Sequence, residues 1–232
     1  MIILQRAACE IARSKGWLSH TPTSFQSAVL DRCRLAQYKA GTPVYSVGDK
    51  PRGMFGIVAG CLGISAARGE QGHCTAHFAM PGSWFGEVSA FTRKPERVGL
   101  ITTRDTELLH LPLRAIDEIV RRDPAAWRLF GLVTIDHLDL AMGGSDDLMI
   151  RDHFKRFVAV LLRLANCRHV NPRDGLLIEV GISHDDLAHM ANVARTTAGA
   201  ILRRLETEGS VALAYRRIVV LAPNDLRRQL RD

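Results

Sequence analysis

Two oppositely charged residues, Glu87 and Arg97, are the strongest candidates for chemistry in this sequence. They lie ten residues apart in the segment PGSWFGEVSAFTRKPERVGLITT, residues 81–103, and Gly86 directly precedes the glutamate. A carboxylate accepts a hydrogen bond from a hydroxyl, and a guanidinium pairs with a phosphate. The segment therefore predicts a pocket for a small ligand that carries both groups. The alternative is an internal ion pair between Glu87 and Arg97 with no ligand.

A second motif lies near the C-terminus, where residues 182–211 read ISHDDLAHMANVARTTAGAILRRLETEGSV. Its apolar spacing predicts helices over residues 184–190 and 195–208, and Ser183 is a good cap for the first. This pattern has the form of a helix-turn-helix, whose second helix enters the major groove of DNA. Small residues at the front of that helix allow a close approach. The candidate DNA contacts are Ser183, His184, Arg195, Thr196, Thr197 and Arg203.

Two short strands are expected directly after this motif, over residues 211–215 and 217–221, with Arg216 at the tight turn between them. A hairpin in this place is typical of a DNA-binding wing. The alternative for the helix pair is a helical hairpin that packs on a protein partner. Charge favours DNA, because residues 151–232 carry 14 Lys and Arg against 9 Asp and Glu, and the whole chain has a net charge of +7.

Two groups of residues could ligate a metal or haem by residue type. One contains His184, Asp185, Asp186 and His189, but aspartate is favoured in the first turn of a helix, so we interpret these residues as capping and surface positions. The other contains His73, Cys74 and His77, which could ligate haem. A haem or redox sensor is therefore an alternative function. No Ser-His-Asp order, nucleophile elbow or P-loop is present, so we expect no enzymatic activity and no metal.

Composition indicates two modest domains with apolar cores, since the chain has 232 residues of which 47% are hydrophobic. No run approaches the roughly 20 apolar residues of a membrane helix. The N-terminus has early charges and no clear signal peptide, so a cytoplasmic protein with no membrane partner is expected. The dispersed cysteines are interpreted as free thiols; they are Cys9, Cys33, Cys61, Cys74 and Cys167.

Hydrophobic periodicity predicts an α+β fold with three parts. Residues 1–30 have helical spacing. Glycine-punctuated strands then predict an antiparallel β-roll; they cover residues 42–47, 53–58, 61–66, 73–80 and 98–111. A short helix over residues 112–122 precedes a long one that starts at Asp123 and Pro124. The expected domains are 1–123 (β-roll), 124–151 (dimerisation helix and hinge) and 152–232 (winged helix-turn-helix).

The long helix carries two apolar stripes, which indicates that it lies between two bodies. One stripe contains Phe130, Val133, His137 and Leu140, and the other contains Leu132, Ile135, Leu138 and Met142. We expect one of these bodies to be the β-roll and the other to be another subunit. Gly143 and Gly144 should weaken the helix, and residues 148–152 are expected to act as a hinge.

With both motifs in this order, residues 38–221 resemble bacterial transcription regulators of the cyclic-AMP receptor protein and fumarate-nitrate regulator (Crp/Fnr) superfamily. The resemblance covers about four fifths of the chain. It implies a β-roll of cyclic-nucleotide-binding type, a homodimer, a palindromic operator in double-stranded DNA, and RNA polymerase as a further partner. The implied ligand is cyclic AMP, with cyclic GMP possible.

Residue by residue, the resemblance implies that Glu87 accepts the ribose 2′-hydroxyl and that Arg97 pairs with the cyclic phosphate. The implied ligand-binding set is His77, Gly86, Glu87, Val88, Ser89, Arg97, Val98 and Met142. Three departures from the family pattern bear on this set. Val98 replaces a hydroxyl residue that contacts the phosphate, residues 141–145 lack the usual pair of hydroxyls for an adenine edge, and His77 replaces a small hydroxyl residue. The base preference is therefore open.

The recognition helix also departs from the family pattern. Arg195 matches a base-reading arginine, whereas Thr196 and Ala200 replace the usual glutamate and second arginine. Fewer direct base contacts are therefore expected. The implied mechanism is allosteric: ligand bound near Met142 would extend the long helix and reorient two Arg195 helices onto successive major grooves. A ligand-independent regulator on the same scaffold is an alternative.

Overall fold

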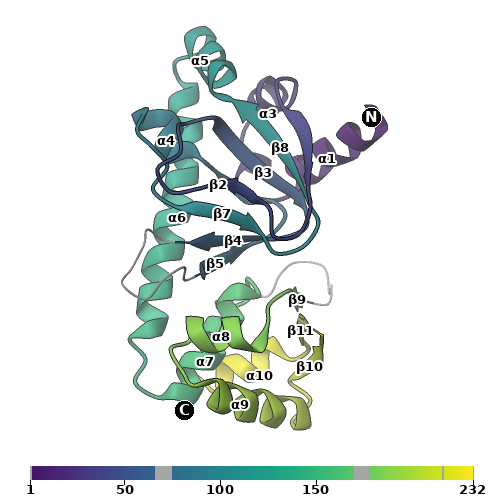
Figure 1. Ribbon diagram of the computed structural model, residues 1–232, viewed down its shortest axis with the longest axis vertical. Coiled ribbons are helices and arrows are strands. Elements are labelled where there is room, and N and C mark those ends of the chain that lie inside the picture. The colour runs from purple at the N-terminus through teal and green to yellow at the C-terminus, as the bar shows by residue number, and fades with distance from the viewer. Residues whose placement is uncertain (1, 66–74, 170–177, 216, 232) are drawn as a thin grey trace. The chain divides into compact units, whose positions relative to one another are not determined.

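The computed structural model describes residues 2–65, 75–169, 178–215 and 217–231 (Figure 1). The chain forms two compact units, Met1–Asp139 and Leu140–Asp232. The boundary falls inside α6 (Ala126–Leu148), so one helix contributes to both units. Among the described helices, none combines the length and the apolarity needed to cross a bilayer.

The first unit contains two four-stranded antiparallel sheets, which confirms the expected β-roll. The strand orders are β1-β8-β3-β6 and β2-β7-β4-β5. The strands are β1 (Arg34–Tyr38), β2 (Pro43–Tyr45), β3 (Gly53–Ala59), β4 (Leu62–Ser65), β5 (Thr75–Ala79), β6 (Trp84–Phe85), β7 (Gly99–Thr102) and β8 (Thr106–Pro112). Buried Phe55, Ile57, Leu100 and Leu108 from both sheets share one core cluster.

One expected strand was wrong, because the run over residues 98–111 is two strands in different sheets. The chain reverses between β7 and β8. The Thr106 hydroxyl stabilises the reversal by donating a 2.7 Å hydrogen bond to the carbonyl of Arg104. At the start of the same turn, the Thr102 hydroxyl donates to the carbonyl of Lys39 at 2.6 Å. The polar residues 102–107, Thr-Thr-Arg-Asp-Thr-Glu, mark the turn in the sequence, and the predicted strand wrongly ran through them.

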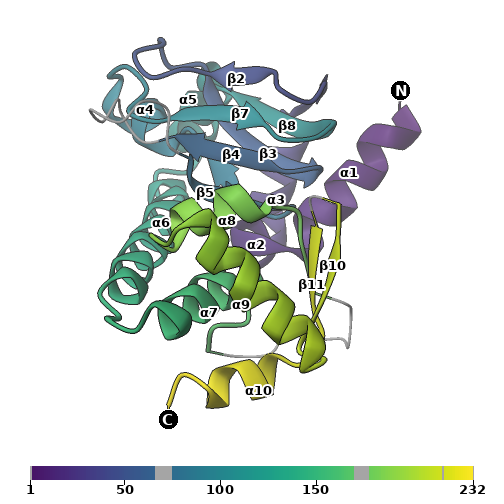
Figure 2. The same cartoon turned by 60° about the horizontal axis from the view of Figure 1, so that its bottom comes forward.

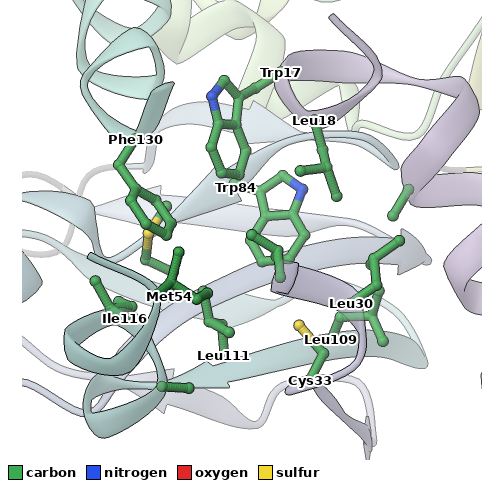
Figure 3. Close-up of a cluster of buried hydrophobic side chains, with 14 of the residues drawn as sticks. Trp17, Leu18, Leu30, Cys33, Met54, Trp84, Leu109, Leu111, Ile116 and Phe130 are labelled. Carbon is green, nitrogen blue, oxygen red and sulfur yellow. The ribbon is translucent and has the colours of Figure 1, made fainter. Parts of the chain in front are cut away.

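Helices pack on the outer face of the β1-β8-β3-β6 sheet and form a second core (Figure 3). They are α1 (Ile2–Ser14), α2 (Gly16–Ser19), α3 (Thr23–Leu30), α5 (Leu113–Arg122) and the first half of α6. Trp17 lies at the centre, with its ring centroid 5.6 Å from Trp84 and 5.9 Å from Phe130. Its indole nitrogen donates to the carbonyl of Leu129 at 2.7 Å. These contacts, each aromatic pair contributing about 1 kcal/mol, hold the start of α6 against the roll.

The two apolar stripes of α6 have different environments in the single chain, and the packed one confirms that one face of the helix lies on the roll. Phe130 and Val133 are 0% and 2% exposed. On the other stripe, Leu132, Ile135, Leu138 and Met142 are 40–59% exposed. Such a spacing of three and four residues is typical of a helix seam that pairs with another helix. The helix continues through both glycines to Leu148.

The second unit is a winged helix-turn-helix (Figure 2). Its elements are α7 (His153–Leu164), β9 (Ile178–Val180), α8 (His184–Met190), α9 (Arg195–Thr207), β10 (Val211–Ala214), β11 (Arg217–Val220) and α10 (Pro223–Arg228). The small sheet has the order β10-β11-β9. Buried Leu187, Ile201, Leu202 and Leu205 join α8 and α9 to the unit's core. All four described cysteines are free thiols; Cys33, Cys61 and Cys167 are buried, and burial raises the pKa of Cys167 to about 11.

Candidate ligand pocket and DNA-binding surface

The glycine before Glu87 is required by a close approach of two backbone segments. Gly86 connects β6 directly to α4 (Glu87–Thr92) and has a φ of 94°, in the left-handed region. A Cβ atom at this position would lie 2.3 Å from the carbonyl oxygen of Gly53 on β3. Only glycine therefore fits both the conformation and the space. The turn places Glu87 at the first position of α4.

We predict that Gly86→Ala destabilises the protein by about 3 kcal/mol, because left-handed strain adds to a clash with a backbone carbonyl that cannot move aside. Gly48→Ala is a matched control, since Gly48 has a φ of 92° but no atom lies within 4 Å of the place that an added methyl group would take. It should cost only the strain, about 1 kcal/mol. Urea unfolding measures both values, and equal losses would contradict the steric explanation.

Glu87 pairs with a histidine from α6. Glu87 is 3% exposed, and its Oε1 lies 2.8 Å from Nδ1 of His137. The imidazole also stacks on Phe85, with centroids 4.8 Å apart and rings 16° from parallel. The alternative of an internal ion pair between Glu87 and Arg97 is therefore wrong. The sequence places His137 on one apolar stripe of α6 but did not lead us to predict this role; the available signal was a lone imidazole among apolar residues.

Arg97 has an exposed side chain, and it forms no ion pair with any residue that the structure describes. The backbone before it is held firmly. Glu96 is 5% exposed, and its carboxylate accepts a 2.6 Å hydrogen bond from the hydroxyl of Ser89 on α4. The Glu96 amide donates to the carbonyl of Asp49, and its carbonyl accepts from Gly48. Burial raises the pKa of Glu96. These bonds hold the loop that carries Arg97 against α4.

The remaining candidates lie at different depths in the roll. Gly86 and Ser89 are buried and Val88 is half-buried, all at the start of α4, and the Ser89 hydroxyl is engaged by Glu96. Val98 is half-buried and packs on the core between the sheets. His77 is half-buried on β5, opposite Ile64 of β4.

Three further residues from the sequence analysis lie outside this group. Met142 is 59% exposed and belongs to the part of α6 in the second unit. His73 and Cys74, which together with His77 were the haem candidates, lie outside the described residues. The structure therefore brings together the glutamate, the start of α4 and the arginine loop, all within the first unit.

The recognition helix α9 presents its N-terminal residues to solvent. Arg195 and Thr196 are exposed, Thr197 is half-buried, and Arg203 is exposed two turns later. Arg195 forms an ion pair with Asp185 of α8 at 2.8 Å, but both side chains are more than half exposed. A pair of this kind contributes about 0–1 kcal/mol, so DNA can displace it readily.

Some polar residues of the motif serve its folding. The Ser183 hydroxyl accepts from the amide of Asp186 and donates to its carboxylate, at 3.1 and 2.6 Å, and so caps α8. His184 is the half-buried first residue of α8. Arg204 lies over the ring of Phe154 at 4.4 Å and packs within the unit. Of the two carboxylates considered as metal ligands, Asp185 thus pairs with Arg195, and Asp186 accepts a hydrogen bond from the capping hydroxyl of Ser183.

Comparison with known proteins agrees with this architecture. Residues 35–123 match the cyclic nucleotide-binding domain, and residues 155–229 match the Crp-like helix-turn-helix domain. The cyclic AMP receptor protein of Thermus thermophilus is 26% identical over 176 residues, covering 76% of this chain and 78% of that protein.

Solved structures of other regulators share the fold, and two of them illustrate the similarity. A CRP-family transcriptional regulator of the same organism has a TM-score of 0.65 at 22% identity, covering 85% of this chain and 97% of that one. The c-di-GMP responsive regulator CLP of Xanthomonas campestris has a TM-score of 0.64 at 19% identity, covering 86% and 99%.

A β-roll of cyclic-nucleotide-binding type, a long helix and a winged helix-turn-helix together define a DNA-binding transcription regulator. The chain belongs to the Crp/Fnr family of transcription regulators. Proteins of this kind are not enzymes.

Proposed function

We propose that this protein is a homodimeric transcription regulator whose affinity for a palindromic DNA operator is controlled by a cyclic nucleotide. The observation that carries the proposal is the arrangement of Glu87 and Arg97. The first is a buried carboxylate at the start of α4, and the second is an exposed guanidinium on a loop that Glu96 and Ser89 hold against the same helix. An arginine held in place without an ion-pair partner among the described residues suits an anionic ligand.

In this proposal Arg97 binds the cyclic phosphate and Glu87 accepts the ribose 2′-hydroxyl. Gly86, Val88 and Ser89 shape the turn at the start of α4. Val98 offers no hydroxyl to the phosphate, which removes about 1 kcal/mol of binding relative to a serine or threonine. Cyclic AMP is the first candidate ligand and cyclic GMP the second.

The choice of base depends on other residues, and we assign it to His77 and Met142. A half-buried imidazole can donate to or accept from a purine edge. The thioether of methionine adapts to different ring shapes but selects poorly between them. Discrimination between adenine and guanine should therefore be modest and should depend mainly on His77.

The exposed stripe on α6 supports the homodimer. Four large apolar side chains at seam spacing are more than a single solvated helix face normally exposes. A second copy of α6 would bury them and set two Arg195 helices about 34 Å apart, one helical turn of DNA. Arg195 would read a base in each half-site, with Thr196, Thr197, Ser183, His184 and Arg203 beside it. In this proposal the regulator acts in the cytoplasm and contacts RNA polymerase.

A second candidate is a regulator that needs no nucleotide, and the contact between Glu87 and His137 favours it. His137 already supplies a hydrogen-bond partner to the carboxylate that a ribose would use. Under this alternative, Glu87 links α4 to α6 permanently. Other ligands also occur among structural relatives, since CLP is described as responsive to c-di-GMP.

Titration of the purified protein with cyclic AMP and cyclic GMP distinguishes these candidates. We expect saturable heat by calorimetry. Saturating nucleotide should also tighten the binding of DNA at least tenfold relative to the nucleotide-free protein, measured on a palindromic duplex selected by the protein from a random library. His137→Ala should preserve or strengthen nucleotide binding if His137 competes for Glu87. Tight DNA binding that neither nucleotide alters would refute the proposal and favour the ligand-independent regulator.

A further inference from the structure

A buried aspartate near the end of α6 is held by two arginines. The side chain of Asp147 is 1% exposed. Its Oδ2 lies 2.6 Å from Nε of Arg163 on α7, and its Oδ1 lies 2.9 Å from Nε of Arg168, which follows α7. Breaking a buried pair leaves a charge without compensation and is strongly unfavourable. The last turn of α6 is therefore bound tightly to α7.

One helical turn earlier, Gly143 makes room for the same arginine. A Cβ atom at Gly143 would lie 2.2 Å from Nη1 of Arg163 and 2.7 Å from its Cζ. The guanidinium would have to shift to admit this atom, and a shift would disturb the bond between its Nε and Asp147. Gly144, in contrast, has no atom within 4 Å of that position. The first glycine thus serves a close contact with α7, which differs from the weak point that the two glycines led us to expect.

A third arginine continues the connection towards DNA. Arg156 of α7 donates to the carbonyl of Ile150, in the segment after α6, at 2.7 Å. Its Nε donates to the carbonyl of Ala191 at 2.8 Å, and its Nη2 donates to Asn192 at 3.1 Å. Ala191 and Asn192, which carry these carbonyls, lie in the turn between α8 and α9, and Asn192 has a φ of 50°. One side chain therefore joins the end of α6 to the turn that starts the recognition helix.

We propose that the last two turns of α6 and the recognition helix α9 behave as one rigid body, and that Asp147 and Arg156 are the positioning residues that set the direction of α9 for DNA binding. The segment 148–152, which the sequence predicts to be a hinge, is held on both sides by these contacts. Any bend that reorients α9 then lies in α6 before Gly143. This agrees with the boundary between the compact units, which falls after Asp139.

Matched substitutions in the full-length protein test the proposal through DNA affinity. The probe is a duplex selected from a random library by the wild-type protein, measured by fluorescence anisotropy with and without saturating cyclic AMP. Gly143→Ala and Gly144→Ala make the same change in the same helix, but only the first displaces Arg163. We expect Gly143→Ala to weaken binding at least tenfold and Gly144→Ala to change it less than twofold.

A second pair removes one charge at adjacent positions. Asp147→Asn should weaken DNA binding at least tenfold, whereas Asp146→Asn, at an exposed residue, should change it less than twofold. Arg156→Gln should weaken DNA binding as Asp147→Asn does. Its control is Arg151→Gln, at an exposed residue. Circular dichroism and gel filtration establish that each variant is folded. If Asp147→Asn fails to fold, the glycine pair decides the question.

Hydrogen exchange supplies a readout that a merely stabilising role would not move. In the wild type, the amides of Met149 and Ile150, which bond to carbonyls of the last turn of α6, should be protected. Asp147→Asn should speed their exchange at least tenfold and leave the β-roll unchanged. Rapid exchange of residues 149–152 in the wild type, or wild-type DNA affinity in Gly143→Ala and Arg156→Gln, would overturn the proposal.

Discussion

Replacing Arg97 with alanine is expected to weaken cyclic-AMP binding about 100-fold. A guanidinium that pairs with a phosphate contributes about 1.5–3 kcal/mol, and 2.7 kcal/mol corresponds to a factor of about 100. The side chain is exposed and makes no ion pair with the described residues, so the free energy of unfolding should change by less than about 0.5 kcal/mol. Calorimetry measures the affinity, and urea unfolding measures the stability.

Lys94 provides the control for Arg97, because it is an exposed cation of the same loop. Lys94→Ala should leave nucleotide affinity within about twofold, since only a residual long-range charge effect is lost. Arg97→Lys should recover part of the affinity as a point charge without the bidentate geometry. Equal heats for the wild type and Arg97→Ala would show that the phosphate is not bound here, and the pocket assignment would fail.

Replacing Leu138 with glutamate is expected to convert the protein to a monomer and to weaken operator binding about 1,000-fold. Leu138 is 52% exposed in the single chain, so a charge there should not disturb the fold of one protomer. Across a helix seam, however, it would place two carboxylates in an apolar interface. Linked half-site binding contributes a factor of about 10² to 10⁴, and a monomer loses it.

Sedimentation and anisotropy measure this effect, with Thr134→Glu as the control. Thr134 is exposed on α6 between the two apolar stripes and is not part of either. Its substitution should leave the protein dimeric and operator affinity within about threefold. A Leu138→Glu protein that stays dimeric would place the interface on another surface and remove the support that this stripe gives to the proposed dimer.

The local elements follow closely from the sequence. Helix α8 has the predicted bounds of 184 and 190, because Ser183 caps it and its apolar residues repeat at the helical period. The β-roll follows from short apolar runs that glycines separate. The two apolar stripes of α6 were predicted from the helical period, and the structure shows which of them packs on the roll: Phe130 and Val133 are buried, whereas the other stripe is exposed in the single chain.

Long-range pairings were decided by the tertiary structure alone. Fifty residues separate Glu87 from His137, and nothing in either segment indicates that an imidazole, rather than Arg97, meets this carboxylate. Likewise, Asp147 is one of two adjacent aspartates, and only packing buries this one between Arg163 and Arg168. The same packing explains why Gly143 supports a contact while Gly144 faces open space.

The physical reason for this division is the range of the forces involved. Helix and strand periodicity, capping and turn preferences act over a few residues, so the sequence by itself determined most of the elements, the two motifs and the family they resemble. The partner of a buried charge depends on which distant elements pack together. The tertiary structure therefore decided how Glu87 is held, how the loop of Arg97 is fixed, and which residues join α6 to the recognition helix.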